Sequence, residues 1–186
     1  MQRVLLILTK KYILIEYDEQ GRSYMKLSGP QEYGLRCLLV MAKEPHKVHT
    51  IPEIAKCEAL SKPYVAKLMR ILHKGGLVKS IRGQQGGYQL IHAPDQTPLS
   101  MVLNCLGGRL YSERFCKQYS GGKKICVRNA DCSLRVLWKT LDATFQRVLG
   151  ELTLQSLNCG EVQMAAKVKH FVSNVAQGNL GRAPTG

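Results

Sequence analysis

Three cysteines in the second half of the chain are the residues best suited to chemistry. Cys116, Cys126 and Cys132 follow a C-x9-C-x5-C spacing in a polar, glycine-bearing segment. Structural cysteines usually behave as small buried hydrophobic residues, but these lie in a loop-like sequence. Nearby cations favour the thiolate, which is the form that binds metal or reacts. These cations are Lys117, Lys123, Lys124 and Arg128.

Soft thiolates indicate zinc or an iron–sulfur cluster. Zinc sites usually carry C-x2-C knuckles with a fourth Cys or His nearby, and this segment has neither. A 2Fe–2S or 4Fe–4S cluster, held by three cysteines and one outside ligand, agrees better with the spacing. The spacing also permits a cluster-free thiol switch, or a loop of unligated cysteines. Four further cysteines accompany helical patterns and are predicted to fill the core, namely Cys37, Cys57, Cys105 and Cys159.

A second candidate site is the basic stretch 61–90, which contains no Asp or Glu. Ser61 suits an N-cap and Pro63 suits the first turn of the helix that follows. Gly75-Gly76 can end this helix, and two strands then flank a glycine-rich tip. A basic helix and a hairpin indicate a recognition helix and wing. The alternative is a solvated helix and hairpin, although solvated faces usually mix both charge signs. The predicted buried stripe of the helix is Val65, Leu68, Met69 and Leu72.

The residues before this stretch predict the other helices of the same unit. Ser28 with Gln31 forms a capping box, and Pro45 ends the helix that it begins. Thr50 with Glu53 forms a second capping box, which opens a short helix over 51–58. This order of elements is that of a winged helix-turn-helix. We therefore predict a mainly α fold with a small β-hairpin wing. The domain spans about 25–95, with the helix-turn-helix at about 51–74 and the wing at about 77–91.

A long apolar stripe follows the cysteines. After a short helix over 99–106, Asp131 is a suitable N-cap for a helix from Cys132 to Leu157. A stripe of this length often pairs with its copy across a dimer axis, although a role within one chain is the alternative. We assign 96–160 to the cysteine loop and a dimerisation helix. The stripe consists of Leu134, Leu137, Trp138, Leu141, Phe145, Val148, Leu149 and Leu152.

The two ends of the chain carry weaker signals. Residues 1–24 either form a hairpin of 4–8 with 12–17, or are an extension before a start at Met25, which we favour. The tail 161–186 predicts a helix over 162–175 and disorder beyond it. The apolar face of that helix is Met164, Val168, Phe171 and Val175.

Composition narrows the class of protein. The 186 residues carry a formal net charge of +14, concentrated in one folded segment, which favours nucleic acid over a membrane as the partner. No apolar run is as long as a membrane span, and 4–8 is too short for a signal-peptide core, so we expect a cytoplasmic protein. The histidines form no pairing motif with a cysteine and no glycine-rich phosphate loop is present, so we do not expect an enzyme.

From about Met25 to Cys159 the chain resembles the IscR/NsrR family of iron–sulfur winged-helix regulators. The resemblance rests on MKLS at 25–28, LSKPYVAKLMRILHKGGLV at 60–78, SIRGQQGGYQL at 80–90, the three loop cysteines, Leu137-Trp138, and LTLQSL at 152–157. It implies a homodimeric transcription regulator whose cluster controls binding to a pseudo-palindromic DNA operator.

Two departures from the family pattern concern the cluster ligands. The first cysteine interval is longer here than in the best-known members. The IscR type has a His at the third position after the third cysteine, where this chain has Arg135, which is not a useful iron ligand. In the nitric-oxide-sensing type an acidic residue on the partner's first helix completes the site, and Glu32 stands at the matching place. Glu32 of the partner subunit is therefore a candidate ligand. The alternative is a solvent-facing Glu near a helix N-terminus.

The winged unit also predicts how DNA would be read. The first turns of the basic helix should lie nearest the bases, which makes Lys62, Tyr64 and Lys67 candidates for base contacts. Arg70 and Lys74 are candidates for phosphate contacts, which position a protein without specifying sequence. The resemblance places Arg82 in the minor groove, and Gly83, Gly86 and Gly87 let the backbone turn tightly beside it.

Overall fold

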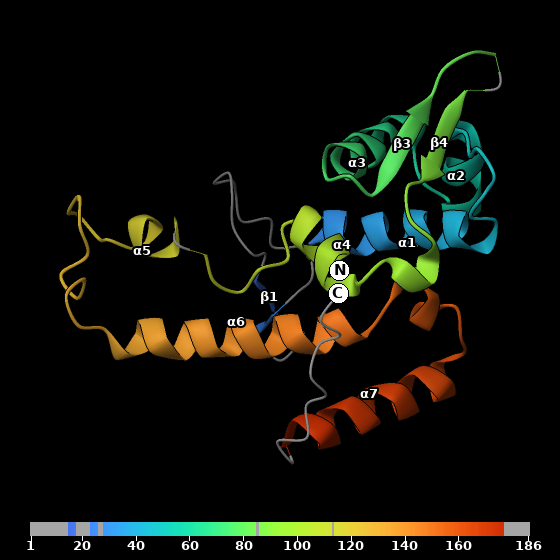
Figure 1. Ribbon diagram of the computed structural model, residues 1–186. Coiled ribbons are helices and arrows are strands. Elements are labelled where there is room, and N and C mark those ends of the chain that lie inside the picture. The colour runs from blue at the N-terminus through green and yellow to red at the C-terminus, as the bar shows by residue number, and fades with distance from the viewer. Residues whose placement is uncertain (1–14, 18–22, 26–27, 85, 113, 177–186) are drawn as a thin grey trace.

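The computed structural model describes residues 15–17, 23–25, 28–84, 86–112 and 114–176. Helices α1 to α4 and the β3–β4 hairpin form a head, and α6 runs away from it to carry α5 and the cysteine loop at its far end (Figure 1). The expected mainly α fold with a small wing is confirmed. The elements are β1 Ile15–Tyr17, β2 Ser23–Met25, α1 Gly29–Lys43, α2 Ile51–Glu58, α3 Lys62–Lys74, β3 Val78–Ile81, β4 Gly87–Leu90, η1 Pro94–Gln96, α4 Leu99–Cys105, α5 Arg114–Gln118, α6 Ser133–Glu151, η2 Leu154–Leu157 and α7 Glu161–Ala176.

Capping residues set the starts of α1, α2 and α3 as the sequence predicts. Ser28 and Gln31 form the capping box of α1, and Thr50 and Glu53 form that of α2. The Ser61 hydroxyl accepts a hydrogen bond from the Tyr64 amide at the start of α3. The predicted stripe of α3 is fully buried and packs with α1 and α2 into one core. Its main partners are Cys37, Leu38 and Met41 of α1 and Ile54 of α2.

The turn between α2 and α3 fixes the direction of the basic helix. Ala59 ends α2 in the left-handed region, with φ of 53°, and Leu60 donates a backbone hydrogen bond to Ala55 over 2.9 Å. The Arg36 guanidinium bonds the Glu58 carboxylate over 2.6 Å and so ties α1 to the end of α2. These contacts hold α3 with its cationic side away from the core.

The wing is an antiparallel pair in which Val78 faces Leu90 and Ile81 faces Gly87. The wing lies within its predicted range of about 77–91, since β3 begins at Val78 and β4 ends at Leu90. The backbone at His49 pairs with β4, where His49 and Tyr88 exchange two hydrogen bonds of 2.8 Å. This pairing was not predicted from the sequence. A Cβ on Gly87 would lie 2.4 Å from the His49 carbonyl oxygen, so this position requires glycine.

The bounds of α6 correct two predictions. Its N-cap is Cys132 rather than Asp131, and the helix ends at Glu151 rather than at Leu157. It stops because the chain returns to the head, where the Leu152 carbonyl accepts a 2.8 Å hydrogen bond from the Leu99 amide. Leu154 then donates a backbone hydrogen bond to Thr97 and is fully buried. The segment LTLQSL therefore anchors α6 to the head instead of extending it.

The two halves of α6 differ in burial. Its C-terminal half packs on α4, where Asn104 donates to the Gln146 side chain over 2.9 Å. Its N-terminal half extends beyond the head (Figure 1) and leaves Leu134, Leu137, Trp138 and Leu141 between 38% and 52% exposed. A role within one chain therefore accounts for only half of the predicted stripe.

The termini add two short elements. Strand β1 pairs with β2, so that Ile15 faces Met25, and the other predicted strand, 4–8, lies outside the described residues. Helix α7 extends one residue beyond its predicted range at each end, with Met164 and Phe171 half-buried and Val168 exposed. In the part of the chain that the structure describes, no helix is both long and apolar enough to cross a membrane.

Candidate functional site

Helix α3 presents a uniformly cationic surface opposite its buried stripe. The side chains of Lys62, Lys67, Arg70 and Lys74 are all exposed. None of these four forms an ion pair with another described residue, so their charge is available to a partner. Such a surface is suited to the phosphate backbone of DNA.

Tyr64 occupies a different environment from these four cations. Its ring packs edge-to-face on Tyr33 of α1, with ring centroids 5.7 Å apart, and burial raises the pKa of its phenol. A Cβ added at Gly29 would lie 3.3 Å from the Tyr64 hydroxyl oxygen. Tyr64 therefore supports the contact between α1 and α3, while Lys62 and Lys67 are the exposed cations of the first turns.

The wing tip presents Arg82 immediately after β3. Gly83 adopts φ of 113°, a conformation that L side chains rarely adopt, and Gly86 donates a 2.9 Å backbone hydrogen bond to its carbonyl. A Cβ on Gly86 would lie 2.6 Å from the Ile81 carbonyl oxygen. The glycines thus close the tip tightly and leave the Arg82 side chain exposed.

The three predicted cysteines line one cavity of about 350 Å³ at the far end of α6. Cys116 lies in α5, Cys126 lies in the loop after it, and Cys132 caps the N-terminus of α6. Each is half-exposed and carries a free thiol. The structure therefore brings together residues that are sixteen positions apart in the sequence.

Aromatic contacts hold α5 beside the first turns of α6. The Phe115 ring lies 6.3 Å from Trp138, 5.5 Å from Tyr111 and 4.7 Å from Tyr119, measured between ring centroids. The Tyr111 hydroxyl lies 3.6 Å from the Cys116 sulfur. These contacts form the wall of the cysteine cavity.

The donor set of this cavity, three thiols around its wall, is of the kind that can hold an iron–sulfur cluster. Among the described residues, no three His, Cys, Asp or Glu side chains lie close enough together to hold one ion. A cluster distributes its thiolate ligands over several iron atoms, so its ligands need not converge on one point. The cavity also contains a buried cationic donor without a partner among the described residues, the Nε of Arg135.

Glu32, the candidate fourth ligand, lies exposed in the first turn of α1. Figure 1 places α1 in the head and α5 beside the far end of α6. Within one chain the two are separate, so Glu32 could reach this cavity only from a second copy.

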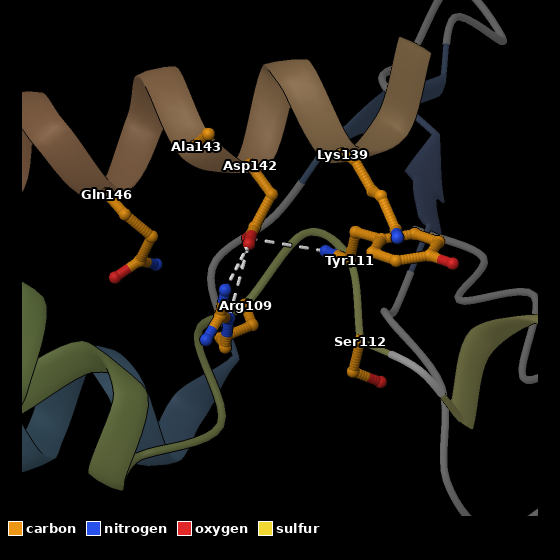
Figure 2. Close-up of a pocket in the computed structure, with 7 residues that line it drawn as sticks. All are labelled: Arg109, Tyr111, Ser112, Lys139, Asp142, Ala143 and Gln146. Carbon is orange, nitrogen blue, oxygen red and sulfur yellow. Dashed lines mark hydrogen bonds and ion pairs between the residues drawn. The ribbon is translucent and has the colours of Figure 1, made fainter. Parts of the chain in front are cut away.

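A buried carboxylate links the cysteine segment to α6 (Figure 2). Asp142 is the one buried side chain of α6, a helix that the structure describes throughout, and is 3% exposed. One carboxylate oxygen accepts from the Arg109 guanidinium, at 3.2 Å from Nε and 2.5 Å from Nη2. The other accepts from the backbone amides of Leu110 and Tyr111, at 3.0 and 3.3 Å. We call this set the Asp142 clamp, because it fixes the segment 109–111 that leads into the cysteine loop.

The electrostatics of the clamp keep Asp142 ionised. Burial acts to raise the pKa of this carboxyl, but the Arg109 hydrogen bond and the two amides outweigh it, so the pKa lies below its usual range. The local sequence signal for the clamp is a single acidic residue, Asp142, next to the apolar stripe of a helix.

Replacing Asp142 by Asn should lower the free energy of unfolding by about 1–3 kcal/mol at pH 7, because a charged, fourfold hydrogen-bonded acceptor is lost. The folded-state pKa is depressed, so this stabilisation is present above the unfolded pKa of about 3.9 and is lost as pH falls through the folded value. Urea denaturation at pH 7 and pH 3 measures the difference, which should shrink at pH 3. Asp95→Asn, at an exposed carboxylate, is the control. Equal stability of Asp142→Asn and wild type at pH 7 would refute the clamp.

The other four cysteines divide between core and surface. Cys37 is fully buried, and burial raises the pKa of its thiol to about 12. Burial also raises the pKa of Cys105, which packs against the core. Cys57 is exposed, and its assignment to the core was wrong because α2 buries only Ile54 and Ala55. Cys159 is half-buried beside η2, and its thiol donates to the Ser156 carbonyl over 3.0 Å. Its assignment to the core was also wrong, because it lies outside the core cluster.

Comparison with known proteins agrees with this arrangement. A family described as "Rrf2: Iron-dependent Transcriptional regulator" matches residues 27–159. The transcriptional regulator NsrR of Halalkalibacterium halodurans is 29% identical over 147 residues, covering 78% of this chain and 98% of that protein. IscR of Erwinia tasmaniensis, also a transcriptional regulator, is 28% identical over 134 residues, covering 72% and 78%. The structure of CymR, the global cysteine regulator of B. subtilis, is similar with a TM-score of 0.52 at 28% identity, covering 72% of this chain and 96% of that one.

Proposed function

Because this chain belongs to the Rrf2 family of iron-dependent transcriptional regulators, we propose that it binds a DNA operator as a homodimer under the control of an iron–sulfur cluster. The observation that carries this proposal is the single cavity that Cys116, Cys126 and Cys132 line. That cavity stands at the N-terminus of the same helix whose exposed stripe is suited to dimerisation.

DNA is read by α3 and the wing. Lys62 and Lys67 contact base edges in the major groove. Tyr64 takes part only through its hydroxyl, at the margin of this base-contacting group, because its ring packs on Tyr33. Arg70 and Lys74 contact phosphates. Arg82 enters the minor groove, where Gly83 lets the backbone approach the DNA closely.

Arg82→Ala should lower operator affinity by about 1–3 kcal/mol, or about 5- to 150-fold, because one cation is removed from the minor groove. Fluorescence anisotropy with labelled operator at fixed salt measures the loss. Lys79→Ala removes the same charge from an exposed position within β3 and should have a smaller effect. Equal losses in the two variants would show that Arg82 contributes charge but no specific contact.

The exposed half of the α6 stripe forms the dimer interface. Leu134, Leu137 and Leu141 recur every three or four residues on one face, with Trp138 beside them. A contiguous exposed apolar surface of this kind is unusual on a monomer and is typical of an interface. A two-fold axis along this stripe places two α3 helices and two wings on one operator.

Cys116, Cys126 and Cys132 hold the cluster, and Glu32 of the partner subunit completes its ligand set. When bound, the cluster supplies redox-active iron. Exposure to oxygen, exposure to nitric oxide or a shortage of iron can each lead to loss of the cluster. Cys132 joins the cavity to the start of α6, and the Asp142 clamp joins the segment before the cysteines to its middle. Leu152 and Leu154 then join the end of α6 to the head. A change in the cysteine loop is thereby transmitted to the DNA-binding unit, provided that the two states differ in cluster affinity.

A cluster-free thiol switch is the second candidate. It is favoured by three free thiols around one cavity.

Iron and sulfide analysis separates the two functions. Protein purified anaerobically, or reconstituted with iron and sulfide, should be coloured and should contain both elements. A colourless, iron-free protein after anaerobic reconstitution would favour the thiol switch.

A further inference from the structure

Arg135 stands out in the cysteine cavity because its hydrogen bonding is incomplete. It lines the cavity together with Cys116, Cys126 and Cys132. Its Nε is buried and has no hydrogen-bond partner among the described residues. Leaving a buried charged donor unsatisfied is strongly unfavourable, so each such group calls for an explanation.

The rest of the Arg135 side chain is held in place. Its Nη2 donates to the backbone carbonyl of Asn129, in the loop between Cys126 and Cys132. Its own amide donates to the Cys132 carbonyl over 3.1 Å, in the first turn of α6. The planar guanidinium is therefore fixed at one edge, and its buried Nε–H is the donor that lacks an acceptor among the described residues.

A guanidinium stays protonated and has no acceptor, so Arg135 cannot ligate iron. It can donate a hydrogen bond to sulfur, and hydrogen bonds to cluster sulfurs set the reduction potential. We infer that the Arg135 Nε–H donates to a sulfur of the bound cluster, a thiolate or an inorganic sulfide, and favours the reduced state. This inference rests on the proposed function and makes Arg135 a positioning residue that tunes the site.

Arg128 provides a matched comparison. It lines the same cavity and carries the same charge, but its side chain is exposed. Water screens an exposed charge, so removing it should change the field at the cavity less than removing the buried donor.

The test is the midpoint potential of the reconstituted protein, measured by anaerobic dithionite titration followed by visible absorbance. Dithionite supplies one electron to the cluster, and no bond forms or breaks. Arg135→Met should lower the reduced-to-oxidised ratio at a fixed potential about tenfold, which is about 59 mV for a one-electron couple. Arg135→Lys, which keeps the charge but loses the Nε–H, should also lie below wild type. Arg128→Met should shift the ratio less than about threefold.

Each outcome decides the inference. A wild-type potential in Arg135→Met, or an equal shift in Arg128→Met, overturns it and leaves the cluster assignment intact. If Arg135→Met takes up no cluster, Arg135→Lys decides, and a wild-type potential there also overturns it. A purely structural role would shorten the lifetime of the cluster without moving the potential. Trp138, the only tryptophan of the chain, lines the same cavity, so its fluorescence reports on the fold of the loop in cluster-free variants. Failure of the wild type to take up a cluster would refute the proposed function, and the inference with it.

Discussion

Replacing both Leu137 and Leu141 by Asp should convert the protein to a monomer and lower its operator affinity by about 100- to 10,000-fold. The two side chains are 48% and 43% exposed in the single chain, so the fold of one subunit does not depend on burying them. In the proposed dimer they face their copies, and four unpaired carboxylates would be buried there. A monomer binds each half-site separately and loses the effective concentration that links the two, which accounts for the size of the effect.

Light scattering after size exclusion and operator anisotropy measure the two consequences. The matched control is Val162→Asp with Val172→Asp, which places the same charges on exposed apolar positions of α7. Circular dichroism confirms that each variant is folded. A Leu137→Asp, Leu141→Asp protein that remains a dimer would place the interface elsewhere.

Cys126→Ala should abolish stable cluster uptake, leaving less than about a tenth of the wild-type iron, because the site loses one of its three thiolates. Operator binding by this variant should equal that of cluster-free wild type under all redox conditions. The measurements are iron and sulfide content, visible absorbance and anisotropy. Cys126 lies in the loop between α5 and α6, so the substitution leaves every helix of the head unchanged.

Cys57→Ala is the control for that variant, because Cys57 is also a free thiol but is exposed on α2, in the head. It should take up iron and sulfide as the wild type does. Full cluster content in Cys126→Ala would remove Cys126 from the ligand set and would require a different donor.

The helix-turn-helix could be predicted closely because its boundaries are encoded locally. Thr50 and Glu53 form the capping box at the start of α2. Ser61 is the N-cap of α3, and Pro63 follows it in the first turn. The periodicity of α3 identified its buried side chains without tertiary information. Capping and periodicity both act within a single helix, so a sequence displays them directly.

Features that depend on contacts between distant segments were not predictable in this way. Helix α6 stops at Glu151 because Leu152 bonds to Leu99, although the residues that follow continue an apolar pattern. The strand-like pairing of His49 with Tyr88 has no local signature. Cys57 follows a helical pattern, but α2 buries too few side chains to cover it.

The candidate site shows the same division. The cysteine spacing predicted a common site, and the three thiols line one cavity. The Asp142 clamp could not be predicted, because its partners, Arg109 to Tyr111, lie more than thirty residues earlier in the chain. Arg135 could be excluded as an iron ligand from its chemistry, whereas its buried Nε depends on how the loop folds against α6.

The most direct test of the central claim is an in vitro operator selection, run in parallel on cluster-loaded and cluster-free protein, followed by anisotropy titration of the selected sequences. Both preparations are held at the same dimer concentration and salt, because salt alone changes DNA affinity strongly. The account predicts that the two preparations differ at least about tenfold in affinity, or about 1.4 kcal/mol, for at least one selected pseudo-palindromic sequence. Identical selected sequences bound with identical affinity in both states would contradict it.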